Sequence, residues 1–266
     1  MLHHLTSLQH PLLDPFRELN RKKRSRGNPL FIGEGRLVVD RMLASEYEVV
    51  SVVLGEQAAD HYLDRIPDSV NTILLERSLV SELVGFEFHS GVVASAVRKR
   101  NTDLDLFASL INRSSATIVV CPFTVLPDNL GSVMRLSAGF GVDAVIVGQR
   151  SADPFGRRAM RVSMGNVLQL PVIEPVSIRE IITDLKDRYS YHVVAATGSR
   201  QANELPMRRP SGKLAIVLGN EADGIDESHL ALCNQEVSIR MAGTTDSLNV
   251  ANALAVLLYQ FMQVES

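Results

Sequence analysis

Polar residues that could take part in catalysis gather near the C-terminus, where a turn of Gly, Thr and Asp precedes an apolar helix. A short strand is predicted to end at Met241, and the helix to begin after Asp246 or Ser247, whose side chains can accept hydrogen bonds from free N–H groups. The helix is apolar on nearly every face apart from Asn249 and Asn252. Amides on a buried helix need partners, which can be loop backbone or a ligand. This segment alone does not decide between loop backbone and a ligand as the partner.

Two further segments carry polar residues at the ends of predicted elements. Asn129 and Arg135 belong to a turn and helix that precede a buried strand, and Glu221 follows another buried strand in a Gly-acid-Gly loop. One stripe of that helix is apolar or small, formed by Leu130, Val133, Met134, Ser137 and Phe140. Arg135 is therefore expected to face away from the core. Without further evidence, Arg135 could be an ordinary exposed arginine, Asn129 could be a helix cap, and Glu221 could bind the backbone of its own turn.

In this order, the three segments resemble the signature motifs of the SpoU (TrmH-type) RNA 2′-O-ribose methyltransferase family of the SPOUT superfamily. The resemblance covers roughly the second half of the chain. It implies methylation of a ribose 2′-hydroxyl with S-adenosylmethionine as the cofactor. It also implies a catalytic set of Arg135, Asn129, Glu221, Ser247 and Asn249. The positions that it implies for cofactor binding are Gly198, Leu218, Gly219, Asn220, Gly224, Ile239, Met241, Leu248 and Ala253.

The roles implied by the resemblance can be weighed against side-chain chemistry. Family members carry an arginine at the place of Arg135, where it acts on the 2′-hydroxyl with help from an RNA phosphate. Because a guanidinium stays protonated, it is better suited to orienting a phosphate and stabilising charge than to removing a proton. Glu221 matches a residue that supports the active site. Ser247 and Asn249 match polar residues between cofactor and arginine, and glycines such as Gly219 would let the backbone approach a bound adenosine.

The elements that must position these residues alternate along the chain, which predicts an α/β fold. In the first part, helices are expected over 34–44, 58–65 and 78–84, and strands over 49–54, 72–75 and 92–97. In the second part, strands are expected over 116–120, 143–148, 172–174, 192–196, 214–219 and 236–239. Helices are expected from 131 and over 161–166 and 178–189. Such alternation implies a parallel sheet covered on both faces.

The sequence predicts three regions. They are a basic N-terminal arm over 1–28, a small α/β domain over 29–105, which resembles the L30e-like RNA-binding domains, and a SPOUT methyltransferase domain over 106–266. The family resemblance further implies a deep trefoil knot in the C-terminal domain and a homodimer formed through it. The arm contains one basic cluster, formed by Arg17, Arg21, Lys22, Lys23, Arg24 and Arg26. Such a cluster can be solvated surface or can bind an RNA backbone.

Composition limits the class of protein. At 266 residues and 45% hydrophobic, the chain can bury one large or two modest cores. No apolar run is long enough for a membrane span, and the first residues do not resemble a signal peptide, so the cytoplasm is the expected compartment. Cys121 and Cys233 lie far apart and predict neither a metal site nor a disulfide framework. The net charge is −3, so any RNA contact must be local.

The expected partner is RNA, with rRNA favoured over tRNA. An alternative is a non-catalytic RNA-binding protein that retains the SPOUT fold, although such a protein would not need this polar set. A nucleotide-dependent dehydrogenase lacks support, because no G-x-G-x-x-G motif follows an early strand. A P-loop is absent as well.

Overall fold

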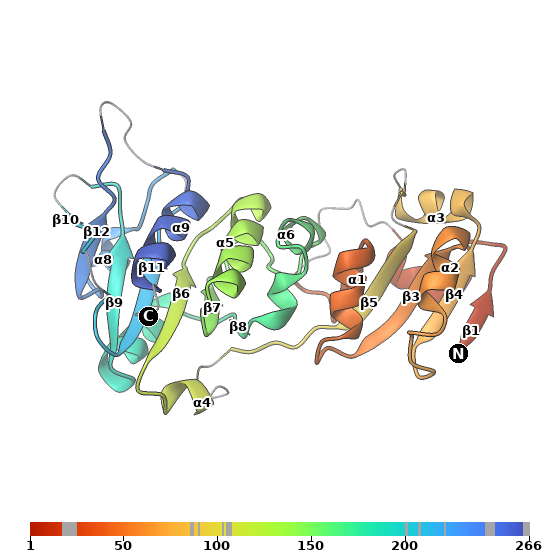
Figure 1. Ribbon diagram of the computed structural model, residues 1–266, viewed down its shortest axis with the longest axis horizontal. Coiled ribbons are helices and arrows are strands. Elements are labelled where there is room, and N and C mark those ends of the chain that lie inside the picture. The colour runs from red at the N-terminus through yellow and green to blue at the C-terminus, as the bar shows by residue number, and fades with distance from the viewer. Residues whose placement is uncertain are drawn as a thin grey trace. The chain divides into compact units, whose positions relative to one another are not determined.

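The computed structural model describes residues 1–17, 26–85, 88–89, 91–102, 104, 108–199, 202–206, 209–220, 222–242 and 248–262. The chain forms two compact units (Figure 1). Unit 1 comprises Met1–Lys99 and Phe155–Gln169, and unit 2 comprises Arg100–Pro154 and Leu170–Ser266. Within the described residues, no helix is long and apolar enough to cross a membrane.

Unit 1 is built on a mixed five-stranded sheet in the order β1-β4-β3-β5-β2. Its strands are β1 (Leu2–His4), β2 (Leu30–Glu34), β3 (Val49–Gly55), β4 (Asn71–Leu75) and β5 (Val92–Val97). Its helices are α1 (Arg36–Leu43), α2 (Glu56–Tyr62), α3 (Arg77–Val84) and α6 (Arg157–Val162), with the short 3-10 helices η1 (Pro11–Phe16) and η3 (Asn166–Gln169). β1, β4 and β3 run parallel, whereas β5 is antiparallel to both of its neighbours.

Residues from outside the expected range of 29–105 complete unit 1. β1 pairs with β4, and Leu13 and Phe16 of η1 are fully buried in the core. The first sixteen residues are therefore folded against the sheet. Arg157 of α6 forms an ion pair with Glu34 at 2.8 Å, and α6 packs against β2. The segment 155–169, which was expected in the SPOUT domain, thus belongs to unit 1.

Unit 2 is built on a seven-stranded sheet in the order β10-β12-β9-β11-β6-β7-β8. Its strands are β6 (Ala116–Cys121), β7 (Ala144–Val147), β8 (Val172–Ile173), β9 (Tyr191–Ala196), β10 (Asn203–Glu204), β11 (Lys213–Leu218) and β12 (Gln235–Ser238). All six pairings are parallel. The fully buried runs of β6, β7 and most of β11 explain their continuous apolar sequences.

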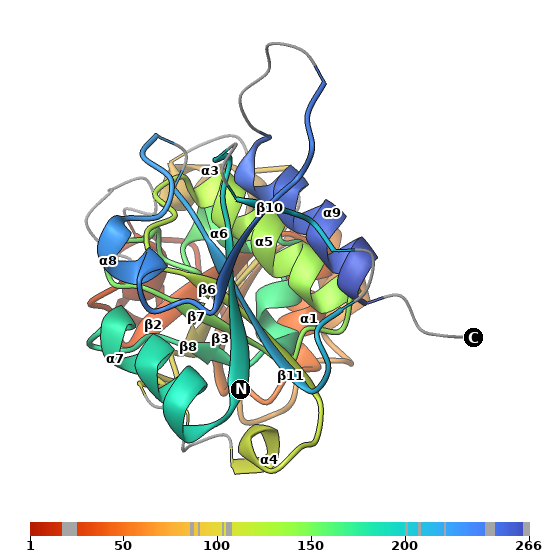
Figure 2. The same ribbon diagram turned by 90° about the vertical axis from the view of Figure 1, so that its left-hand side faces the viewer.

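Helices cover both faces of this sheet, as predicted (Figure 2). One face carries α5 (Pro127–Gly139) and α9 (Val250–Phe261), which pack against each other. The other carries α7 (Ile178–Thr183), its π-helical continuation η4 (Asp184–Arg188) and α8 (Glu227–Leu230). A short helix, α4 (Ala108–Ile111), precedes β6. The core on the α7 side is mainly Ile, Leu and Val from the strands and α7.

Three of the predicted helix positions need correction. The motif helix begins at Pro127 and not at Gly131, because the proline ring fits the first helical turn. The helix expected over 161–166 is α6, which begins four residues earlier and ends before Met164 and Gly165, both of which have positive φ. The last helix begins at Val250, and its described N-cap is Asn249. Both caps expected for this helix, Asp246 and Ser247, lie outside the described residues.

Candidate active site

A cavity of about 640 Å³ opens at the carboxyl ends of β9, β11 and β12 in unit 2. In parallel sheets, ligands bind in this position, where the strand order reverses. Here the chain proceeds from β6 to β8 in one direction and then returns to β9 on the other side, with β11 inserted between β9 and β6. The cavity therefore lies where sheet topology favours a ligand.

The cavity brings together most of the residues singled out from the sequence. Its lining includes all nine predicted cofactor-binding residues: Gly198, Leu218, Gly219, Asn220, Gly224, Ile239, Met241, Leu248 and Ala253. Of the predicted catalytic residues, Asn129 and Asn249 also line it. Glu221 and Ser247 lie outside the described residues. Lining a cavity places these residues together but does not assign a role to any of them.

Arg135 lies on α5 and does not line this cavity. Its side chain is exposed, as the apolar stripe predicted, while Leu130, Val133 and Met134 are fully buried. It follows Asn129 by six residues, which corresponds to about 9 Å along a helix axis. Arg135 is thus on the helix that borders the cavity, at a distance from the described lining.

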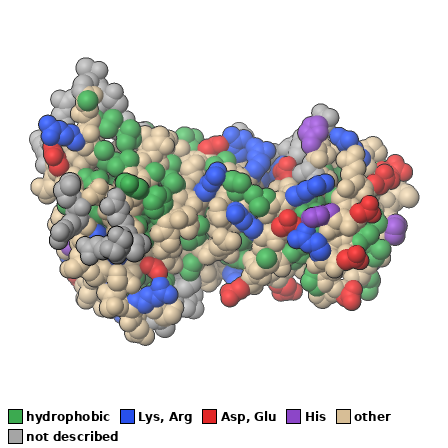
Figure 3. All heavy atoms as spheres, viewed as in Figure 1, with side chains coloured by type: hydrophobic (Ala, Val, Ile, Leu, Met, Phe, Trp, Pro, Cys, Tyr) green, Lys and Arg blue, Asp and Glu red, His purple; other side chains and the backbone are tan. Residues whose placement is uncertain are grey.

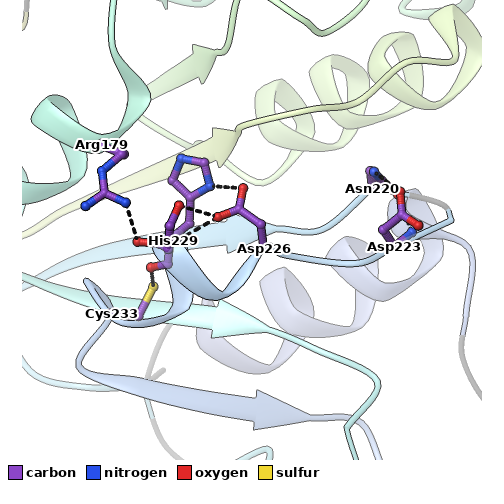
Figure 4. Close-up of polar contacts among 7 residues, drawn as sticks. Arg179, Asn220, Asp223, Asp226, His229 and Cys233 are labelled. Atoms are coloured by element: carbon purple, nitrogen blue, oxygen red, sulfur yellow. Dashed lines mark hydrogen bonds and ion pairs between the residues drawn. The ribbon is translucent and has the colours of Figure 1, made fainter.

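The loop after β11 is held by its own hydrogen bonds. The Asn220 side-chain oxygen accepts hydrogen bonds from the backbone N–H groups of Ala222 and Asp223, both at 2.6 Å. The side chains of Asn220 and Asp223 face each other in Figure 4. The Asn220 backbone N–H donates to the Gly224 carbonyl at 2.8 Å. The structure therefore gives Asn220 a structural task in the same loop that lines the cavity.

Gly219 is required by this loop for a reason that the sequence did not show. A Cβ atom placed on Gly219 would lie 2.8 Å from the carbonyl carbon and 2.9 Å from the Cα of Gly224. Gly224 itself has a φ of +70°, which disfavours other residues. Close packing of the loop on itself already accounts for Gly219, whether or not adenosine approaches there.

A pair of amides joins the two helices beside the cavity. The Asn249 side-chain N–H donates to the side-chain oxygen of Asn129 at 2.9 Å. The Asn249 oxygen accepts from the Ala251 backbone N–H at 2.9 Å and so caps α9. Asn249 and Asn252 are both exposed, but Asn129 is buried, so the Asn249 amide supplies a partner that the buried Asn129 side chain needs. The pair fixes the start of α9 against the first turn of α5.

The sequence analysis did not single out several residues of the lining. They are Leu126, Ala196, Thr197, Ala222, Asp223, Val237, Val250 and Leu257. Half of them, namely Thr197, Ala222, Asp223 and Val250, directly adjoin a predicted site residue along the chain, so that neighbour could have indicated them. Asp223 is the acidic member among them, and it stands within the Gly-acid-Gly loop that had already been recognised.

Comparison with solved structures shows which known proteins share this fold. The AdoMet-bound rRNA methyltransferase from Sinorhizobium meliloti shares the fold, with a TM-score of 0.82 and 22% identity, over 97% of each chain. An RNA 2′-O ribose methyltransferase structure has a TM-score of 0.71 at 24% identity and covers 98% of this chain and 97% of that one. The fold is thus the one found in RNA methyltransferases.

Sequence comparison narrows this to one family. The model of the SpoU rRNA methylase family matches residues 116–259. An uncharacterized tRNA/rRNA methyltransferase of Mycobacterium tuberculosis is 32% identical over 262 residues, covering 94% of this chain and 88% of that protein. A 23S rRNA (guanosine-2′-O-)-methyltransferase of Haemophilus ducreyi is 28% identical over 202 residues, covering 76% of this chain and 81% of that protein. The chain belongs to the SpoU rRNA methylase family.

Proposed function

We propose that this protein is an S-adenosylmethionine-dependent methyltransferase that methylates a ribose 2′-hydroxyl in RNA, with ribosomal RNA as the substrate class. The observation that carries the proposal is the convergence of the three motif segments beside one cavity in a member of the SpoU family. Relatives named as 23S rRNA 2′-O-methyltransferases favour rRNA over tRNA.

The chemistry of the cavity fits S-adenosylmethionine. Its volume of about 640 Å³ lies within the range of small-molecule sites. Leu218, Val237 and Ile239 offer apolar surface for an adenine ring, and the Asp223 carboxylate offers an acceptor for an ammonium group or a ribose hydroxyl. When bound, the cofactor supplies an activated methyl group. The protein must then hold the cofactor and the RNA hydroxyl in place.

Among the proposed catalytic residues, Arg135 is the one proposed to contact RNA directly. The exposed Arg135 guanidinium binds a phosphate of the RNA and stabilises charge near the ribose hydroxyl, since it stays protonated. Asn129 and Asn249 keep α5 and α9 in register beside the cavity. Glu221 and Ser247 are assigned to the same site by their motif positions alone.

Unit 1 is proposed to be the L30e-like domain that presents RNA to unit 2. Its mixed sheet with helices α1, α2 and α3 agrees with a small α/β domain. The basic side chains of Arg21, Lys22, Lys23 and Arg24, which lie outside the described residues, are proposed to bind RNA phosphates.

The proposed assembly is a homodimer formed through unit 2. The apolar sequence of α9 indicated a buried helix, but one part of its surface is exposed. Val256 is 40% and Tyr259 is 64% exposed. Leu126, just before α5, is 52% exposed, and Figure 3 shows hydrophobic side chains gathered over α5 and α9. Such a patch is typical of an interface. The trefoil knot implied by the family is part of the same proposal, and the packing of α9 back onto α5 is compatible with it.

Light scattering tests the assembly. The expected mass is twice the 29.2 kDa of one chain. Tyr259→Glu should shift the mass toward the monomer, because a carboxylate would be buried without a partner. Lys186→Gln changes the net charge by the same one unit on η4, the continuation of α7 on the opposite face of the sheet. A wild-type monomer would refute the dimer.

Calorimetry tests the enzymatic proposal. S-adenosylmethionine or its demethylated product should bind with micromolar affinity, about −8 kcal/mol. The alternative, a non-catalytic RNA-binding protein, predicts RNA binding without cofactor binding. The absence of any cofactor binding by the folded full-length protein would therefore favour the alternative and refute the enzyme.

A further inference from the structure

A second cavity, of about 320 Å³, opens at the carboxyl edge of the same sheet. It lies beyond β6 and β7, whose following loops contribute Phe123 and Arg150. Leu218, Asn220, Asp223 and Gly224 border both cavities. The loop after β11 is therefore a shared wall between this smaller cavity and the proposed cofactor site. The predicted catalytic residues that the structure describes, Arg135, Asn129 and Asn249, do not line the smaller cavity.

One wall of the smaller cavity combines an aromatic ring with a cation. The Arg150 guanidinium carbon lies 4.2 Å from the centroid of the Phe123 ring. Arg150 is exposed, and within the described residues this ring contact is its one interaction. Val176, at the rim, is 81% exposed, which is high for a large apolar side chain. Planar guanidinium and aromatic groups are the surfaces on which unpaired RNA bases stack.

Another part of the lining, at Asp226 and His229, is polar and hydrogen-bonded. The Asp226 carboxylate accepts hydrogen bonds from the Ser228 hydroxyl at 2.5 Å and from the His229 backbone N–H at 3.0 Å. It also contacts the His229 ring at 2.5 Å, as Figure 4 shows. Burial raises the pKa of Asp226, but the hydrogen bonds from Ser228 and His229 outweigh it and leave the pKa below its ordinary value. The carboxylate is thus a fixed acceptor, with its side chain 60% exposed.

These groups match the parts of a single nucleotide. A base can stack on the Phe123–Arg150 pair or on Val176, while its edge donates to Asp226. The positive charge of Arg150 suits a phosphate. The volume of about 320 Å³ is at the lower end for ligand sites, so it suits one nucleotide and excludes a double helix. A simple anion site would not need the aromatic ring or the carboxylate.

We infer that the smaller cavity holds an unpaired nucleotide of the RNA substrate while the ribose to be methylated lies at the larger cavity. The inference rests on the proposed function and adds a specificity site to it. The segment between β6 and α5 links the two sites, because it contributes Phe123 to the smaller cavity and Leu126 and Asn129 to the larger one. Recognition of one base at a fixed place beside the cofactor would select which ribose is presented.

Steady-state kinetics tests this site with ribosomal RNA from cells that lack the protein as the methyl acceptor. Phe123→Ala should raise the KM for RNA at least about fivefold, which corresponds to the loss of one stacked base. Arg150→Gln should lower the slope of log affinity against log salt by about one, because one phosphate contact is lost. Neither variant should change the affinity for S-adenosylmethionine more than about twofold.

Arg188→Gln is the matched control. Arg188 also stacks on an aromatic ring, with its guanidinium carbon 4.9 Å from the Tyr189 centroid, and it lines neither cavity. It should leave the KM and the salt slope unchanged. If Phe123→Ala and Arg150→Gln behave like this control, the nucleotide site is refuted.

Cross-linking tests whether the smaller cavity binds RNA, independently of whether the protein transfers a methyl group. RNA that contains 4-thiouridine should cross-link under ultraviolet light to peptides carrying Phe123 or Val176. Cross-links elsewhere but none to these peptides would overturn the inference even for an active enzyme. If the wild-type protein transfers no methyl group, the proposed function fails, and the cross-linked peptides still decide whether the cavity binds RNA.

Discussion

The amide pair between Asn129 and Asn249 offers the sharpest test of how the site is held together. Asn249→Ala removes two interactions at once. One is the N-cap of α9, which contributes about 1 kcal/mol to the free energy of unfolding, and the other is the hydrogen bond to Asn129, which contributes about 1 kcal/mol. The expected loss is therefore about 2 kcal/mol. Asn249→Ser can still cap the helix but is too short to reach Asn129, so about half of the loss should remain.

A double-mutant cycle isolates the hydrogen bond from the cap. Asn129→Ala, Asn249→Ala and the double variant should give a coupling of about 1 kcal/mol, because the two side chains are in direct contact at 2.9 Å. Urea denaturation followed by circular dichroism, at one protein concentration, measures each stability. Additive losses with no coupling would mean that the bond between α5 and α9 contributes nothing, and the reasoning would fail.

Two other changes probe the proposed cofactor loop and the basic segment. Gly219→Ala should weaken S-adenosylmethionine binding at least tenfold in calorimetry, since its Cβ would displace Gly224, whereas Gly139→Ala, whose Cβ meets nothing within 4 Å, should bind normally. Equal affinities would contradict the loop geometry. Neutralising the four side chains of residues 21–24 should lower the salt slope of RNA binding by up to about three, without affecting the cofactor. Arg113→Gln, which removes an ion pair with Asp143, is the control and should leave the salt slope unchanged. If the variant neutralised at residues 21–24 also keeps the wild-type slope, these residues do not contact RNA.

Much of the site could be predicted because its residues follow strands whose apolar runs are plain in the sequence. β6, β9 and β11 lie within a residue of their expected positions, and strand ends then place Gly198 and Gly219 together at one edge. The cap of α9 was less predictable, because Asp246, Ser247 and Asn249 all suit an N-cap, and the structure shows Asn249 in that role.

Other features depend on contacts between distant parts of the chain. The pairing of β1 with β4 joins residues about seventy positions apart, and three residues at the start of a chain carry too little periodicity to predict a strand. The Phe123–Arg150 stack joins two loops that become neighbours only when β6 and β7 pair. The exposed face of α9 could not be read from a sequence that is apolar on nearly every side.

The central claim is tested most directly by measuring methyl transfer to ribosomal RNA and mapping the product. The purified protein with S-adenosylmethionine should form a 2′-O-methylated nucleotide, and Arg135→Ala should lower the rate by about two orders of magnitude, or about 3 kcal/mol of barrier, while cofactor affinity stays within a few-fold. Methylation of a base in place of the ribose, or an Arg135→Ala variant with the wild-type rate, would contradict the account.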